Sequence, residues 1–124
     1  MSPVYPDPDT ATREEVAVWE REAFYDREIA PKLAAIAKEC EARGMSFLAR
    51  VEWAAGKSGS TSVRHPHTDR DMLFVMFADR ANGNGDTLIM ALMKYAREHG
   101  HESVCMTRLG VPEKPEPAKA TLTP

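Results

Sequence analysis

The spacing of the apolar residues changes abruptly at Gly44, and this change constrains the fold more than any other feature of the chain. Before it, apolar residues recur every three or four positions, which places them on one stripe of a helix facing the core. After it, they occupy every second position, the spacing of a half-buried strand. The first set is Ile29, Leu33, Ile36 and Cys40, and the second is Phe47, Ala49, Val51 and Trp53. The chain therefore combines helix and strand within one short stretch.

The first helix has a clear start and a predicted interruption. Thr12 and Glu15 match a capping box, in which a hydroxyl and a carboxylate satisfy backbone N–H groups at the helix N-terminus. Pro31 lies inside the helical pattern and has no N–H to donate to the residue four before it. We therefore expect either a bend at Pro31 or a restart just before it, with Asp26 as the cap.

The middle of the chain allows two interpretations. Residues 54–63 are rich in Gly and Ser and predict a turn or loop, with or without a short returning strand at its end. Met72 to Ala78 is an unbroken apolar run that fits a buried strand or a buried helix. We favour a helix from Asp69 to Ala81, because Asp69 is a good N-cap and Asn82-Gly83 is a good stop.

The last third of the chain predicts a helix and then a strand. Asn84 or Asp86 can cap the helix, and Gly100 follows its basic last turn. Residues 103–109 predict a final strand, in which one face carries Val104, Met106 and Arg108 and the other carries Cys105, Thr107 and Leu109.

These elements predict a small, mostly helical α+β domain in the order helix, strand, helix, helix, strand, with helices packed on a two- or three-stranded sheet. If the two strands pair, the crossover through the helices makes them parallel. We expect one domain over residues 10–111, with an unstructured, proline-rich segment on each side, residues 1–9 and 112–124. Because a two-stranded sheet is marginal alone, we also expect either a third strand from the returning segment or a homodimer.

Charge and cysteine content narrow the setting. The net charge of −3 gives no broad attraction to DNA or to an anionic membrane. Cys40 and Cys105 lie in apolar surroundings and are expected to be buried, reduced thiols, as in a bacterial cytoplasm. We expect no membrane-spanning segment, because the longest apolar run is far shorter than a bilayer requires.

Two long stretches, residues 20–53 and 81–104, resemble small uncharacterised proteins encoded by bacteriophages and prophages. The resemblance is carried by Phe24-Tyr25-Asp26 to Pro31, Gly44-Met45-Ser46-Phe47 and Arg97-Glu98-His99-Gly100-His101. It implies a phage or prophage origin and action inside a bacterial host. It implies no activity and no catalytic residue.

The histidines form two His-x-His pairs, and the first pair is followed by carboxylates at alternate positions. Imidazole and carboxylate groups together can hold zinc or another divalent ion. The candidate metal ligands are His65, His67, Asp69, His99 and His101, with Asp71 next in the pattern. Surface histidines are the favoured interpretation, because Pro66 extends the first pair and a cationic His99 suits a helix C-terminus.

A second group of residues is locally basic. Lys57, Arg64 and Arg70 could contact phosphates, which makes a small nucleic-acid-associated regulator the alternative function. Asp69 and Asp71 offset this charge, and no aromatic platform accompanies it. Gly56-Lys57-Ser58 lacks the earlier glycine and the following helix of a phosphate-binding loop, so it predicts a polar turn.

No motif for catalysis or for a cofactor is present, so we expect a non-enzymatic protein that acts by protein–protein interaction. Four methionines fall on the two predicted later helices, where flexible thioethers suit irregular cores and adaptable interfaces alike. They are Met72, Met76, Met90 and Met93. Most of this methionine surface is expected in the core, and any exposed part is the predicted docking site for a second copy or a host protein.

Overall fold

A computed structural model of the chain describes residues 4–115 and confirms an α+β fold. The region predicted as one domain falls into two compact units, and the boundary between them in the sequence lies between Met72 and Leu73. The first unit contains a long interrupted helix and a β-hairpin, and the second contains helices.

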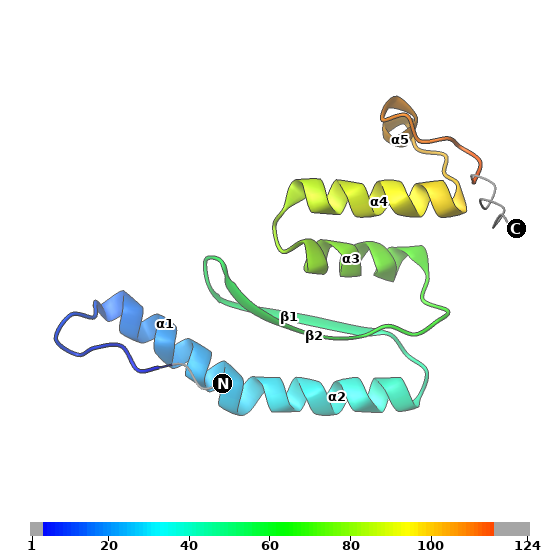
Figure 1. Ribbon diagram of the computed structural model, residues 1–124. Coiled ribbons are helices and arrows are strands. Elements are labelled where there is room, and N and C mark those ends of the chain that lie inside the picture. Colours follow the sequence, from blue (N-terminus) through cyan, green and yellow to red (C-terminus); the bar gives the residue numbers. More distant parts are fainter. Residues whose placement is uncertain (1–3, 116–124) are drawn as a thin grey trace, which may run out of the picture. The chain divides into compact units, whose positions relative to one another are not determined.

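The first unit begins with a helical rod made of α1 (Arg13–Phe24), a π-helical turn (Tyr25–Ile29) and α2 (Ala30–Ala42) (Figure 1). The predicted capping box is confirmed. The Glu15 N–H donates to Thr12 Oγ1 over 3.1 Å, and the Thr12 N–H donates to Glu15 Oε2 over 3.4 Å. Local chemistry therefore fixes where the rod starts.

The rod continues through Pro31 by widening rather than by restarting. The Ala30 N–H donates to the Tyr25 carbonyl, five residues back, which is the hydrogen bond of a π-helix. A wider turn just before Pro31 suits a residue that offers no N–H of its own. The predicted bend is seen between α1 and α2 in Figure 1, but the predicted Asp26 cap is wrong, because Asp26 lies inside the π turn.

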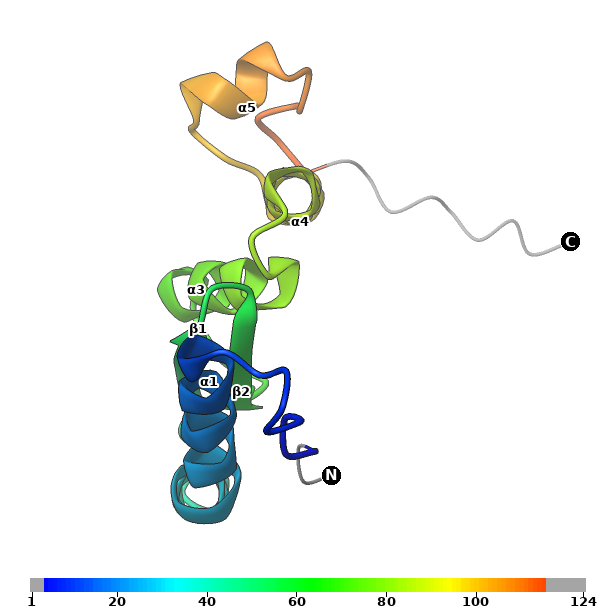
Figure 2. The ribbon, with the colours of Figure 1, turned by 90° about the vertical axis from the view of Figure 1, so that its left-hand side faces the viewer.

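The hairpin consists of β1 (Phe47–Ala54) and β2 (Lys57–Val63), joined by a turn in which Gly56 has φ 73°. The strands are antiparallel, with Phe47 opposite Val63 and a register irregularity between Glu52 and Ala54. The returning segment that the sequence left open as a loop or a short strand is therefore a full strand. Viewed along the rod, the hairpin lies on one side of it (Figure 2).

One face of the hairpin packs on the rod. Tyr25 is 7% exposed, and its ring centroid lies 4.9 Å from that of Trp53. On α2, Ala37 is buried at 6% exposure, whereas Ile36 is 43% exposed. The prediction that Ile36 faces the core is thus wrong. The buried line of α2 runs through a small alanine, which allows the helix to approach the sheet closely.

The second unit is built on α3 (Arg70–Ala81) and α4 (Gly85–His99). The helical interpretation of Met72 to Ala78 is confirmed, and the strand alternative is wrong. Asn82 and Gly83 have φ values of 50° and 84°, as the predicted stop requires. Asn84, and not Asp86, caps α4, because its Oδ1 accepts the Thr87 N–H over 3.0 Å.

The predicted final strand is instead a short helix, α5 (Val104–Arg108). Ser103 caps it by accepting the Met106 N–H over 3.2 Å, and Gly110 with φ 82° follows its end. The predicted parallel pairing is wrong as well: the two strands found in residues 4–115 belong to one antiparallel hairpin. Because no strand in residues 4–115 lies beside this segment to pair with it, a capped helical turn satisfies its backbone groups instead.

The segments flanking the predicted domain make several contacts. The ring of Tyr5 lies 4.6 Å from that of Trp19, edge to face. The His101 N–H donates to the Glu113 carbonyl over 3.0 Å. Most of the tail predicted to be unstructured, residues 116–124, lies outside the described residues.

Candidate functional site

The first histidine pair is built into the junction between α2 and the hairpin. The His65 N–H donates to Ser46 Oγ over 3.1 Å, and the His65 carbonyl accepts the Thr68 hydroxyl over 2.6 Å. Its ring lies against Gly44, where an added Cβ would stand 3.3 Å from Nε2. His67 follows with its ring centroid 3.8 Å from that of His65. His65 therefore joins the loop after β2 to the residues that precede β1.

The second pair is committed to local hydrogen bonds. The His99 ring stacks on Tyr95 at 4.3 Å, and its Nδ1 lies 3.1 Å from the Tyr95 carbonyl. The Ser103 N–H can only donate, so His101 Nδ1 accepts it over 3.0 Å, whereas the Val111 carbonyl can only accept, so Nε2 donates over 2.8 Å. Both His101 nitrogens are in use. A metal ion bound there would have to displace one of these bonds.

The candidate ligands do not converge as a set. Within the described part of the chain, no three His, Cys, Asp or Glu side chains are placed to share one metal ion. Asp69 is engaged locally, because its Oδ1 accepts the Arg70 N–H over 2.7 Å. Sequence proximity brings His65 and His67 together, but no third ligand joins them among residues 4–115.

The basic residues are divided by the hairpin. Lys57 is the first residue of β2, whereas Arg64 follows its last residue, and seven strand residues span about 20 Å. Arg70 begins α3, beyond the His65 loop. Gly56-Lys57-Ser58 forms the hairpin turn and the start of β2, with no helix after it. The segment from Lys57 to Arg70, considered as a nucleic-acid contact, thus includes a regular strand, and its three basic residues cannot all contact one phosphate.

The π turn and the end of β1 line a shallow, open pocket of about 430 Å³ that sequence reasoning missed. Tyr25 and Trp53 form its aromatic side, and half-exposed Phe24 stands at its edge. Trp53 Nε1 is buried and has no hydrogen-bond partner among the described residues. Pro31 was the available signal, because a proline within a helical pattern is a common reason for an irregular turn.

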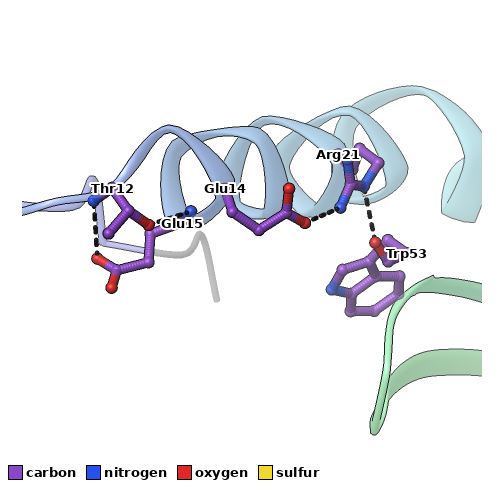
Figure 3. Close-up of polar contacts among 5 residues, drawn as sticks. All are labelled: Thr12, Glu14, Glu15, Arg21 and Trp53. Atoms are coloured by element: carbon purple, nitrogen blue, oxygen red, sulfur yellow. Dashed lines mark hydrogen bonds and ion pairs between the residues drawn. The ribbon is translucent and has the colours of Figure 1, made fainter.

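Arg21 joins α1 to the end of the hairpin beside this pocket (Figure 3). Its Nε donates to the Trp53 carbonyl over 2.7 Å, and its Nη2 pairs with Glu14 Oε1 over 3.2 Å. The Trp53 carbonyl lies at the irregularity in the strand register. Arg21 therefore supplies a hydrogen-bond donor to a carbonyl at the point where the strand pairing is irregular.

The helices α3 and α4 present large apolar side chains to solvent. Phe74 is 36% exposed, Val75 54%, Ile89 45% and Met90 60%. We call these four residues the α3–α4 surface. Within it, Phe74 of α3 also packs edge to face on Tyr95 of α4, with ring centroids 5.4 Å apart, so the two helices share an aromatic contact. The two helices are fixed against each other, yet part of their apolar surface stays open.

The four methionines are divided between core and surface, and the two cysteines are less buried than predicted. Met76 is 6% exposed, but Met90 is mostly exposed, so the methionine set is divided between core and surface. Both cysteines are free thiols, as expected. The prediction that both are buried is wrong, because Cys105 on α5 is exposed and Cys40 is half-buried.

None of the helices in residues 4–115 combines the length and the apolar content needed to span a bilayer. Comparisons of the chain with protein-family models, with curated proteins and with solved structures give no match.

Proposed function

We propose that this chain is a non-enzymatic accessory protein of phage or prophage origin, that it acts by binding another protein in the bacterial cytoplasm, and that it does so as a homodimer. The observation that carries the proposal is the exposure of the α3–α4 surface. The resemblance of residues 20–53 and 81–104 to phage and prophage proteins supports the cellular setting.

The apolar content of the chain is only partly used inside it. Hydrophobic residues make up 43% of the sequence. Seven of those in the described residues are buried, and no large side chain there falls below 2% exposure. Large apolar side chains exposed on both helices of a pair are typical of a surface that another protein covers. Met90 adds a flexible thioether, which adapts to the shape of a partner.

The charge beside this surface indicates the chemistry of the partner. Lys94 is exposed and lies four residues after Met90, so both are on one side of α4. Arg97 follows one turn later and is half-buried. The partner that fits best is a protein segment with an apolar stripe flanked by carboxylates, such as an acidic amphipathic helix.

The test compares two variants of the tagged full-length chain in capture from host lysate, followed by mass spectrometry. V75D/M90D removes two exposed apolar groups and adds charges that repel an acidic partner. M45D is the matched control, because Met45 is 49% exposed but belongs to the first unit. We expect one protein to be captured by the wild type and by M45D, and lost with V75D/M90D.

Purified partner should then bind the wild type with an affinity that falls as salt is raised, because Lys94 contributes to recognition. Capture that is equal for all three chains, or absent from all, would contradict the proposal.

A further inference from the structure

We propose that two copies of the chain pair through the outer edge of β2, which creates a four-stranded antiparallel sheet in the order β1–β2–β2–β1. The inference rests on the homodimer part of the proposed function and names the surface that makes it. It does not involve the α3–α4 surface, so either can fail without the other.

The outer edge of β2 pairs with no other strand in residues 4–115 and carries few of the residues that usually block strand addition. Within residues 4–115, β2 pairs with β1 and with no other strand, so its outer row of backbone N–H and C=O groups faces away from the sheet. Natural edge strands are usually blocked by charges, prolines or bulges. β2 has seven residues, no proline, and one charged side chain, that of Lys57 at its first position. Its composition therefore permits strand addition.

The outer edge of β1 is less suited to strand addition, because it is irregular and its strand carries more charge. The strand register is irregular between Glu52 and Ala54, which interrupts a flat edge. Arg21 Nε donates to the carbonyl of Trp53 at this irregularity. β1 also carries charged Arg50 and Glu52. A strand approaching the hairpin thus meets fewer obstacles at β2.

A second copy of β2 is the occupant that this edge fits best. A twofold axis at Ser60, the middle residue, pairs all seven positions of two antiparallel β2 strands. Ser58 then lies opposite Ser62 of the partner subunit, and Gly59 opposite Thr61 of the partner subunit. Every pair keeps both residues on the same face of the sheet, and no pair places two charges together.

The helical rods also fit this arrangement. In each copy α2 contacts both strands of its hairpin, so one rod covers a width of two strands. Two hairpins joined edge to edge have centres about 9.4–9.8 Å apart, because strands are spaced by about 4.7–4.9 Å. Packed helices lie about 8–10 Å apart. Both rods occupy the same face, and the exposed Ala34 and Ala35 keep α2 narrow. Pairing of the strands therefore brings two helices to their packing distance.

The decisive experiment changes the charges on β2 and measures the mass in solution by sedimentation. S58K/S62K places lysine opposite lysine twice in the proposed register, whereas S58K/S62E places lysine opposite glutamate twice. In both variants Lys replaces Ser58 opposite Glu52 of the same hairpin, where its charge is tolerated. The two chains differ only at position 62. Circular dichroism serves as the control that both variants are folded.

We expect the wild type to sediment at twice the chain mass of 13.8 kDa, S58K/S62E to remain a dimer, and S58K/S62K to dissociate roughly tenfold to hundredfold more easily than S58K/S62E. Amide hydrogens of residues 58–62 should exchange faster on dilution. A monomeric wild type, or equal dimerisation of the two variants, would overturn the inference. V75D/M90D should lose its captured partner and stay dimeric; a dimer broken by this variant but not by S58K/S62K would assign dimerisation to another surface.

Discussion

Replacement of Gly59 by alanine tests how closely Tyr25 packs on the hairpin. Gly59 lies opposite Val51 in the register, on the face that meets the rod. A Cβ at this position would stand 2.6 Å from Tyr25 Oη and 2.8 Å from Tyr25 Cζ. The Tyr25 ring cannot simply swing away, because it is 7% exposed and lies against Trp53. Accommodation therefore requires the ring or the strand to move.

Two opposing effects set the size of the change in the free energy of unfolding. Overpacking a filled site costs about 1–3 kcal/mol. Alanine in place of glycine in a strand returns about 0.5–1 kcal/mol, because the unfolded chain loses less freedom on folding. The net effect is a loss of about 0.5–2 kcal/mol. For a small unit with a urea slope near 1–2 kcal/mol per M, this lowers the midpoint by about 0.25–2 M.

Tryptophan fluorescence during urea unfolding is the suitable assay, because both tryptophans, Trp19 and Trp53, belong to the first unit. The control is the same substitution in a Y25L background, where the overlapping ring is absent. There G59A should become neutral or stabilising by about 0.5–1 kcal/mol. An equal effect of G59A in both backgrounds, or a more stable G59A single variant, would show that Tyr25 and Gly59 are not in close contact.

Three further changes test other contacts. T12A should lower the stability of the first unit by about 1 kcal/mol in the same urea assay, because it removes one half of the capping box. R21M should lower the free energy of unfolding by about 1 kcal/mol, because Arg21 supplies the donor to the Trp53 carbonyl. E14Q should lower it by less than about 0.5 kcal/mol, because the ion pair between Arg21 and Glu14 is exposed to solvent. Equal losses would contradict this ranking. H101L should speed hydrogen exchange in residues 103–111 at least tenfold, because it removes the bonds to the Ser103 N–H and the Val111 carbonyl, and unchanged exchange would refute the assigned role.

The two proposed surfaces assign dimerisation to the first unit and partner binding to the second. In our proposal the β2 edge, in the first unit, joins two copies by backbone hydrogen bonds, which set few requirements on the side chains. The α3–α4 surface, in the second unit, offers apolar side chains and Lys94, which select a partner by shape and charge. A dimer presents this second surface twice, so a partner with two matching segments would be held more tightly than one with a single segment.

Local signals in the sequence were sufficient for several elements. The Thr12 capping box, the Asn82-Gly83 stop and the end of α4 at Gly100 all appear where the residues predict them. The two-residue alternation of β1 was also visible, because it depends on which side chains one face of a strand must bury. In each case the chemistry lies within about four residues of the feature that it determines.

Tertiary structure decided what these short-range signals leave open. Alternation in residues 103–109 is compatible with a strand only if another strand lies alongside, and without one Ser103 caps a helix instead. The buried position on α2 is Ala37 rather than Ile36, because the approach of the hairpin selects the helix face. His65 and His101 are alike in the sequence as members of His-x-His pairs, yet the His65 N–H donates to the Ser46 hydroxyl whereas the His101 ring bonds to the Val111 carbonyl. Those partners are up to 19 residues away, so only the folded chain could assign them.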